Sequence, residues 1–259
     1  MAALIPKSFE QRFRSLELAV TTSLDTAAIG RALTRAAMSH PDWGTDAIKL
    51  MHIGVPGVDA WLSYKWHVWW TLPAHWRDDL TLVDGETAVT IFRPDVAMTY
   101  ASMQRTMYTS ERLNAADKRP RVSPPKGTYL HTLDERLLEF PLIRPRLPAS
   151  DWQLASVGQE LYLGRAARRV RATRRANSVR SDDPRLSGFW MGVDDYECII
   201  DDELQILLSV TAIVDSVSAA TISVERVIVD EPIPASTFDF SPPAGTRIAQ
   251  VSEKKHTSG

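Results

Sequence analysis

The feature that most constrains the fold is a strict alternation of apolar side chains near the C-terminus. Every even position from residue 204 to 214 is apolar, and residues 222, 224 and 228 continue the same parity with polar residues between them. Side chains of a β-strand point alternately to two faces, so this pattern predicts two long strands, joined by a turn at residues 216–219, with one buried and one solvated face. Such strands are typical of an antiparallel sheet.

Alternation of apolar and polar residues recurs along the chain from residue 61 onwards. Alternating runs predict further strands over residues 64–70, 76–83, 86–92, 152–161, 165–173 and 188–200, and an extended or helical piece over 96–107. Asp84-Gly85 predicts a hairpin between the second and third of these runs, and Tyr162-Leu163-Gly164 predicts another. We therefore expect an α+β fold with a large curved antiparallel sheet, which twist closes toward a barrel or half-barrel of eight to eleven strands by count of these runs.

The N-terminal segment has a different period. Apolar residues recur every three or four positions through residues 8–39, with a possible cap at Ser23 or Asp25, which predicts two short amphipathic helices packed on the sheet. We expect residues 1–59 to form helices and a loop, residues 60–248 a single sheet domain, and residues 249–259 a disordered polar tail. The polar segment 110–127 contains three prolines and is interpreted as a loop that could act as a lid.

Composition excludes several classes of protein. The net charge is -2, which gives no overall attraction to nucleic acid or anionic membranes, and the single cysteine, Cys198, cannot form an intramolecular disulfide. The first 25 residues do not read as a signal peptide, and no apolar stretch is long enough to span a bilayer. The sequence as written therefore predicts a cytoplasmic protein, or one of the cell envelope if the start codon is misassigned.

Tryptophan is concentrated in one short segment. Five of the eight tryptophans lie within residues 61–76, and Tyr64, Trp66, Val68 and Trp70 fall on one face of the strand expected there. Tryptophan serves both cores and binding sites, so two interpretations stand: a core cluster or the lining of a cavity. In the second interpretation, the lining also includes apolar side chains of the later strands, such as Ile206.

Arginine is concentrated in another segment. Residues 165–175 contain six arginines, of which Arg165, Arg169, Arg171 and Arg175 share one parity. The three alternatives are a site for an anionic headgroup or partner, a strand whose charge prevents aggregation, and a nucleic-acid site. No aromatic side chains are interleaved with these arginines for base stacking, which argues against nucleic acid.

The sequence contains no motif that indicates catalysis. Nucleophile elbows, phosphate loops, dinucleotide fingerprints and paired metal-ligating histidines are all missing. The Asp-Asp pairs at 78–79, 182–183, 194–195 and 201–202 do not converge, since adjacent residues of a strand point to opposite faces. Cys198 lies in an apolar run and is interpreted as a buried, inert thiol. We expect no catalytic residue, cofactor or metal.

Several short motifs, in their order along the chain, carry a resemblance. Pro73-Ala74-His75-Trp76-Arg77 is followed by Asp84-Gly85 and by Gly164-Arg165-Ala166-Ala167, then come Gly188-Phe189-Trp190, the acidic turn at 201–203, the two long strands, and FDFSPPAG at 238–245. Over residues 60–248 this order resembles the LolA-like outer-membrane lipoprotein-sorting superfamily, which includes LppX-type proteins and RseB-type sensor domains. The resemblance implies an unclosed half-barrel of eleven antiparallel strands, with helices on its concave side and, in several members, an apolar cavity.

Together these observations predict a non-enzymatic protein that carries or senses a lipid or another hydrophobic small molecule, with Tyr64, Trp66, Val68, Trp70 and Ile206 in the lining. The alternative is a regulatory or scaffold module that binds a protein partner through the sheet edge or through residues 110–127.

Overall fold

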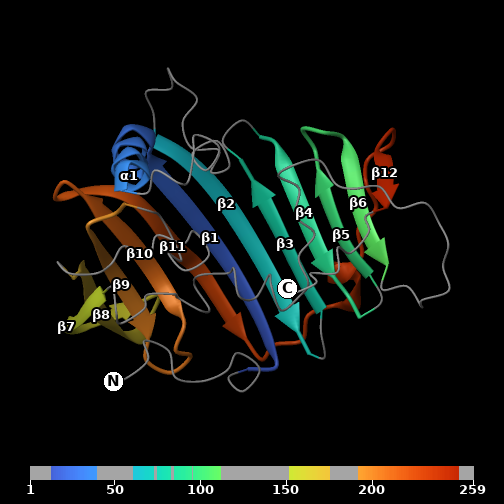
Figure 1. The fold of residues 1–259 in the computed structure, drawn as a ribbon. Helices are drawn as coiled ribbons and strands as arrows, with labels where there is room; N and C mark the ends of the chain where they lie inside the picture. The colour runs from blue at the N-terminus through green and yellow to red at the C-terminus, as the bar shows by residue number, and fades with distance from the viewer. Residues whose placement is uncertain are drawn as a thin grey trace, which may run out of the picture. The chain divides into compact units, whose positions relative to one another are not determined.

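The protein is described here from a computed structural model, which describes residues 13–39, 61–72, 75–82, 85–94, 96–111, 152–175 and 192–250. Within them, twelve strands follow one hydrogen-bonded order, β12-β6-β5-β4-β3-β2-β1-β11-β10-β9-β8-β7 (Figure 1). The order is open, with β12 and β7 at its two ends. This confirms the large unclosed sheet with few helices, although twelve strands rather than eleven are present.

Within the described ranges, most consecutive strands are joined by short turns. Their bounds are β1 Ser15–Asp25, β2 Trp61–Thr71, β3 His75–Thr81, β4 Thr87–Phe92, β5 Val96–Ala101, β6 Thr106–Glu111, β7 Trp152–Tyr162, β8 Arg165–Arg174, β9 Asp195–Asp201, β10 Leu207–Val214, β11 Val217–Val229 and β12 Arg247–Gln250. The helix α1 covers Thr26–Ser39, and the 3-10 turn η3 covers Ala235–Phe238. The four-residue β12 pairs in parallel with β6, so the sheet is mixed at that end.

The prediction of the first of the two N-terminal helices is wrong. Residues 15–25 form β1, in which Leu16, Leu18 and Val20 are buried at every second position, and only the second helix is present, as α1. The spacing of Phe13, Leu16 and Val20 also fits a helix, but Val20, Thr21 and Thr22 are β-branched and favour a strand. Of the two cap candidates, Asp25 is correct, because its carboxylate accepts hydrogen bonds from the backbone N–H groups of Ala27 (2.9 Å) and Ala28 (3.0 Å).

Two of the expected hairpin turns are confirmed, and a third lies at other residues than expected. At the first, Gly85 has φ +85° and the N–H of Leu82 donates to the carbonyl of Glu86. Leu163 and Gly164 both have positive φ between β7 and β8, as a two-residue type I′ turn requires. The turn expected at 216–219 lies earlier, at Asp215 and Ser216. The piece expected over 96–107 is the hairpin of β5 and β6.

By its contacts the chain divides into two compact units. Unit 1 contains residues 1–13, 20–64 and 137–226, and unit 2 contains residues 14–19, 65–136 and 227–259. The boundaries expected from the sequence, at residues 59/60 and 248/249, stay a prediction. Residues 112–127, which include most of the expected lid, lie outside the described residues, whereas Ala249 and Gln250 of the expected tail belong to β12.

The core of unit 1 lies between α1 and the alternating residues of the last long strands. Val170, Cys198, Val210 and Ile222 form one row across β8, β9, β10 and β11, and all four are buried. The helix α1 contacts β10 and buries Ala28, Ile29 and Ala32. The even positions of β10 are buried as predicted, since Leu208, Val210, Ala212 and Val214 are completely buried. The expected solvated face is wrong for this strand, because Leu207 and Ser209 are buried as well and Thr211 and Ile213 are half-buried.

The core of unit 2 contains a cluster on one face of β4, β5 and β6. Val89, Ile91, Tyr100 and Met107 pack together there with Met98 and Phe240. Phe240 follows η3 in a segment that runs back over this face, and its ring lies 5.5 Å from the ring of Tyr100. This segment is further fixed by Arg77, which donates to the carbonyl of Thr237 at 2.8 Å.

One glycine determines how closely α1 approaches the sheet of unit 1. Gly192 has φ +72°, and a methyl group added to it would lie 1.9 Å from the carbonyl oxygen of Ala32 in α1. Both the positive φ and the close approach require glycine.

We expect Gly192→Ala to lower the free energy of unfolding by about 2 kcal/mol or more, because the new methyl group forces α1 away from β10 and strains the backbone. Urea unfolding followed by circular dichroism measures the loss. The matched control is Gly30→Ala in α1, where nothing lies within 4 Å of the added carbon and φ is ordinary. That change should stabilise the protein by about 0.5–1 kcal/mol. Equal stability of the two variants would contradict this account of Gly192.

Candidate functional site

The five residues expected to line a site divide between the two units. Trp66, Val68 and Trp70 belong to unit 2, whereas Tyr64 and Ile206 belong to unit 1. Burial raises the pKa of the half-buried Tyr64, and Ile206 is completely buried. A common lining formed by all five residues stays a prediction.

Within unit 2 the tryptophans of β2 and β3 form one surface. Across the antiparallel pair, Trp66 lies opposite Leu80, Val68 opposite Asp78, and Trp70 opposite Trp76, while Trp76 in turn lies opposite Phe92 of β4. Residues opposite one another share a face of the sheet. We call this surface the tryptophan face; its members are Trp66, Val68, Trp70, Trp76, Asp78, Leu80 and Phe92.

The tryptophan face contains a carboxylate in an otherwise apolar setting. Asp78 is only 2% exposed, and it accepts hydrogen bonds from the indole N–H of Trp76 at 2.6 Å and from that of Trp66 at 3.2 Å. A buried charge is costly unless hydrogen bonds compensate it, and indole N–H groups supply such bonds here. Asp78 therefore fixes the orientation of two indole rings from two strands.

Burial differs along this face. Val68, Trp70, Trp76 and Phe92 are fully buried, which supports the interpretation of the tryptophans as a core cluster for these positions. Trp66 is only intermediate in burial, which places it at the margin of the cluster. The sequence pattern correctly placed Trp66, Val68 and Trp70 on one face, but it did not identify Asp78.

The opposite face of the same strands is polar and internally paired. His67 stacks on Trp69 with 3.7 Å between ring centroids, and its Nε2 lies 3.0 Å from the carboxylate of Glu17. Arg77 lies over the Trp69 ring and forms two hydrogen bonds of 2.7 Å with Asp79. Asp78 and Asp79 therefore serve opposite faces and do not form a joint acid pair.

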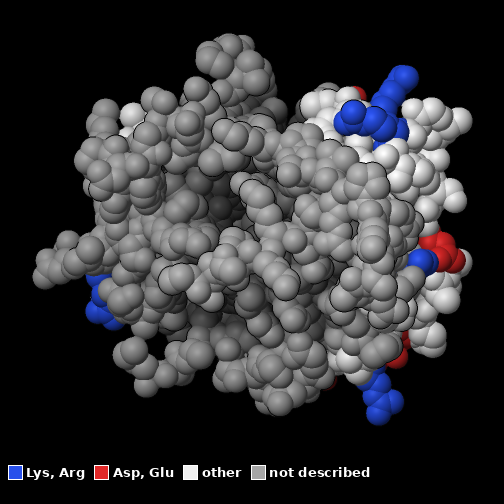
Figure 2. All heavy atoms as spheres, turned by 45° about the vertical axis from the view of Figure 1, so that its right-hand side comes forward, with Lys and Arg blue, Asp and Glu red and all other residues white. Residues whose placement is uncertain are grey.

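Four arginines of β8 are paired with acidic side chains of unit 1, whereas Arg174 donates to the carbonyl of Val193 and lies over the ring of Trp152. Arg168 contacts Asp202 at 3.0 Å, Arg169 contacts Glu160 at 2.8 Å, and Arg171 contacts Asp195 at 2.7 Å. Arg165, Arg169 and Arg171 do share a face, as their parity predicted, but each has an acidic partner there. On the side drawn in Figure 2, the charged residues of the described part stand in small separate groups of both signs. The acidic partners of Arg165, Arg169 and Arg171 argue against an unpaired basic stripe on this face of β8.

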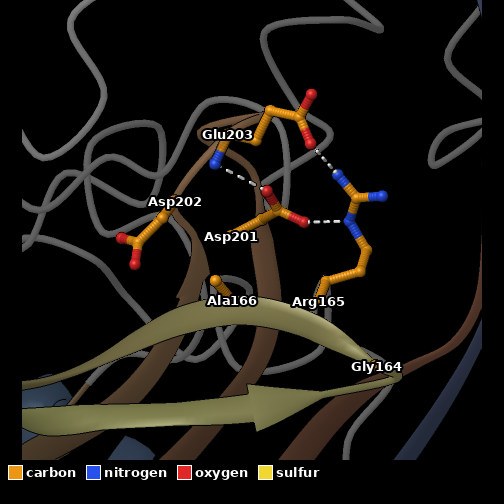
Figure 3. A pocket seen from close by; sticks show the side chains of 6 residues that line it. All are labelled: Gly164, Arg165, Ala166, Asp201, Asp202 and Glu203. Carbon is orange, nitrogen blue, oxygen red and sulfur yellow. Dashed lines mark hydrogen bonds and ion pairs between the residues drawn. The ribbon is translucent and has the colours of Figure 1, made fainter.

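A shallow, open depression of about 460 Å³ lies beside the turn between β7 and β8. Its lining consists of Gly164, Arg165, Ala166, Asp201, Asp202 and Glu203 (Figure 3). The guanidinium of Arg165 bonds to Asp201 and, at 2.9 Å, to Glu203; chiefly because of the bond with Asp201, the pKa of Arg165 is raised. Asp201 is fully buried and also accepts the N–H groups of Glu203 and Leu204, at 2.9 Å and 2.7 Å. The polar groups of this lining satisfy one another's hydrogen bonds. We therefore interpret the depression as the surface of a turn that these bonds stabilise.

The remaining expectations concern metals, membranes and catalysis. Within the described ranges, no group of three or more His, Cys, Asp or Glu side chains is placed to hold a metal ion. No helix in the same ranges is long and apolar enough to cross a membrane. Cys198 is completely buried, and burial raises the pKa of its thiol to about 12, as expected for an inert cysteine.

Among the comparisons with known proteins, only the comparison with solved structures finds similar proteins. No family model matches the chain, and no curated protein matches its sequence. Its fold is similar to the Mycobacterium tuberculosis lipoprotein LppX at 13% identity and a TM-score of 0.41, covering 87% of this chain and 91% of that one. It is similar to MucB in the Pseudomonas aeruginosa MucA/MucB complex at 10% identity and a TM-score of 0.43, covering 90% of this chain.

The chain spans about three fifths of MucB, with 60% of that protein covered. A LolA superfamily protein from Nitrosomonas europaea is also similar, at 8% identity and a TM-score of 0.26, covering 92% of this chain and 96% of that one. Identities this low assign no ligand, partner or activity to the chain.

We expect Asp78→Ala to cost about 2 kcal/mol or more of unfolding free energy, because it leaves the indole N–H groups of Trp76, which is buried, and Trp66, which is half-buried, without their carboxylate. Urea unfolding followed by tryptophan fluorescence measures this cost. Asp79→Ala is the matched control on the opposite, more exposed face of the same strand and should cost less. A larger loss in Asp79→Ala than in Asp78→Ala would show that Asp78 does not hold the tryptophan face together.

Cys198 should resist thiol reagents in the folded protein, since a thiol whose pKa is raised to about 12 stays protonated at mildly alkaline pH. Labelling with a maleimide or an aromatic disulfide, with and without urea, tests this expectation. The unfolded chain, in which the thiol is solvated, should react quickly and with one equivalent of reagent. Fast labelling of the folded protein would mean that the strands around Cys198 open readily.

Proposed function

We propose that the protein is a non-enzymatic binding protein and that the tryptophan face of unit 2 holds the apolar part of a lipid or another small hydrophobic molecule. The observation that carries the proposal is the hydrogen bonding of Asp78 to the indoles of Trp66 and Trp76. These bonds occupy the polar atom of each ring. At the margin of the cluster, Trp66 then presents an apolar surface whose orientation is fixed.

The physical basis of such binding is the removal of apolar surface from water. It contributes about 25 cal/mol per Å², or roughly 0.8 kcal/mol for each methylene group of a ligand. Large aromatic side chains with fixed rotamers lose little conformational entropy on binding, which favours Trp66 as the main contact. Affinity for a series of saturated chains should therefore rise with chain length.

The location of Trp66 distinguishes this proposal from simple core packing. A tryptophan that served the core alone would be as fully buried as Trp70 and Trp76, which lie on the same face. Trp66 instead is only intermediate in burial, while its N–H is bonded to a buried acid. The compartment in which the protein meets such a ligand, cytoplasm or cell envelope, stays a prediction of the sequence.

We expect titration with fatty acids of increasing chain length to change the tryptophan fluorescence of the wild-type protein, with affinity rising along the series. Trp66→Ala should weaken binding by about tenfold or more, because it removes the contact surface. Trp69→Ala is the matched control. Trp69 lies in the same strand, β2, but on the opposite face of the sheet, where it contacts His67 and Arg77.

Circular dichroism of both variants checks that the fold is retained. Binding that is unchanged in Trp66→Ala, or lost equally in both variants, would contradict the proposed site. No response of the wild-type protein to any chain length would contradict the proposed ligand class.

A further inference from the structure

The strand β7 stands at one end of the strand order, and its outer edge is exposed. It pairs with β8 along its whole length, and the order ends with it (Figure 1). Residues 155–159 are all exposed, and so is Leu161. The first residue of β7, Trp152, accepts a hydrogen bond at its carbonyl from the side chain of Arg175, at 3.4 Å. No strand of the described residues is paired with the outer edge of β7. An edge strand of eleven residues presents a row of backbone donors and acceptors that can pair with another strand.

Charge and proline, two of the usual protections of an edge, are almost absent from β7, although the strand carries a third, a β-bulge. The strand contains no lysine and no proline, and its single charged residue, Glu160, is neutralised by Arg169 at 2.8 Å. Two large apolar side chains point outward, since Val157 is 59% and Leu161 is 77% exposed. The next exposed apolar residue, Leu163, lies in the adjoining turn. Natural edges that must stay single carry charges or prolines at such positions.

From these observations we infer that β7 is the interface between two copies of this chain, which pair edge to edge and antiparallel about a two-fold axis. A two-fold interface brings each surface against itself, so it requires a neutral, self-complementary strand. With Gln159 at the axis, Val157 of one copy lies opposite Leu161 of the other, and this contact occurs twice. The net charge of -2 per chain adds little repulsion between copies.

The irregularity in β7 limits where pairing can occur. The register with β8 shifts between Ser156 and Gly158, so Val157 is the extra residue of a β-bulge. A bulge bends the strand and projects its extra side chain outward, which leaves Val157 and the four residues after it as the segment that meets the second copy. This interface is independent of the tryptophan face, because β7 belongs to unit 1.

Sedimentation equilibrium of the full chain tests the proposal. The wild-type protein should reach a mass of twice 29.0 kDa at micromolar concentration. Val157→Lys and Leu161→Lys should each weaken association by roughly tenfold or more, because each places two like charges across the seam. Val217→Lys is the matched control, since Val217 is also 59% exposed and lies in unit 1 but away from β7; it should leave the dimer intact.

A cysteine at the axis locates the interface. In Gln159→Cys the two introduced thiols would lie opposite one another in the dimer, at a separation that a disulfide spans, while the buried Cys198 takes no part. Mild oxidation should therefore give a covalent dimer, and Val217→Cys should not. A wild-type protein that stays monomeric, or a dimer that survives both lysine substitutions, would overturn the inference.

Discussion

The alternation of side chains along paired strands is the constraint on which this structure depends. Each strand has two faces, and the hydrogen-bond register determines which residues of neighbouring strands share them. In unit 1 this rule aligns Val170, Cys198, Val210 and Ile222 into one buried row. In unit 2 it separates Asp78, which bonds to two indoles, from Asp79, which pairs with Arg77 on the opposite face. A shift of one residue in β3 would exchange these two roles.

Much of the sheet could be predicted from the sequence because its signals are local. Alternation predicted β10 and most of β11, and Asp84-Gly85 and Leu163-Gly164 predicted two hairpins by their tolerance of positive φ. The first N-terminal element was predicted wrongly, since its apolar spacing fits a helix as well as a strand. Only pairing within the sheet, where β1 lies between β2 and β11, resolves that ambiguity. The short β12 carries almost no pattern of its own and depends on β6.

The candidate site shows the same division between local and non-local information. The common face of Trp66, Val68 and Trp70 follows from parity within one strand. The role of Asp78 depends on the register between β2 and β3, which places it opposite Val68 and within reach of Trp66. The arginines of β8 were identified as a basic stripe, yet their acidic partners come from β7, β9 and the turn after β9. Charge density along a sequence does not reveal such pairing.

The central claim is that the tryptophan face holds a hydrophobic ligand, and native mass spectrometry of the protein purified from its own host tests it most directly. Organic extraction and identification of any bound compound would follow. The account predicts a uniform adduct in stoichiometric amount, with an extracted molecule that is a lipid or similarly apolar, and loss of the adduct in Trp66→Ala. A wild-type protein that carries no adduct, and that acquires none when incubated with lipid extracts of the host, would contradict it.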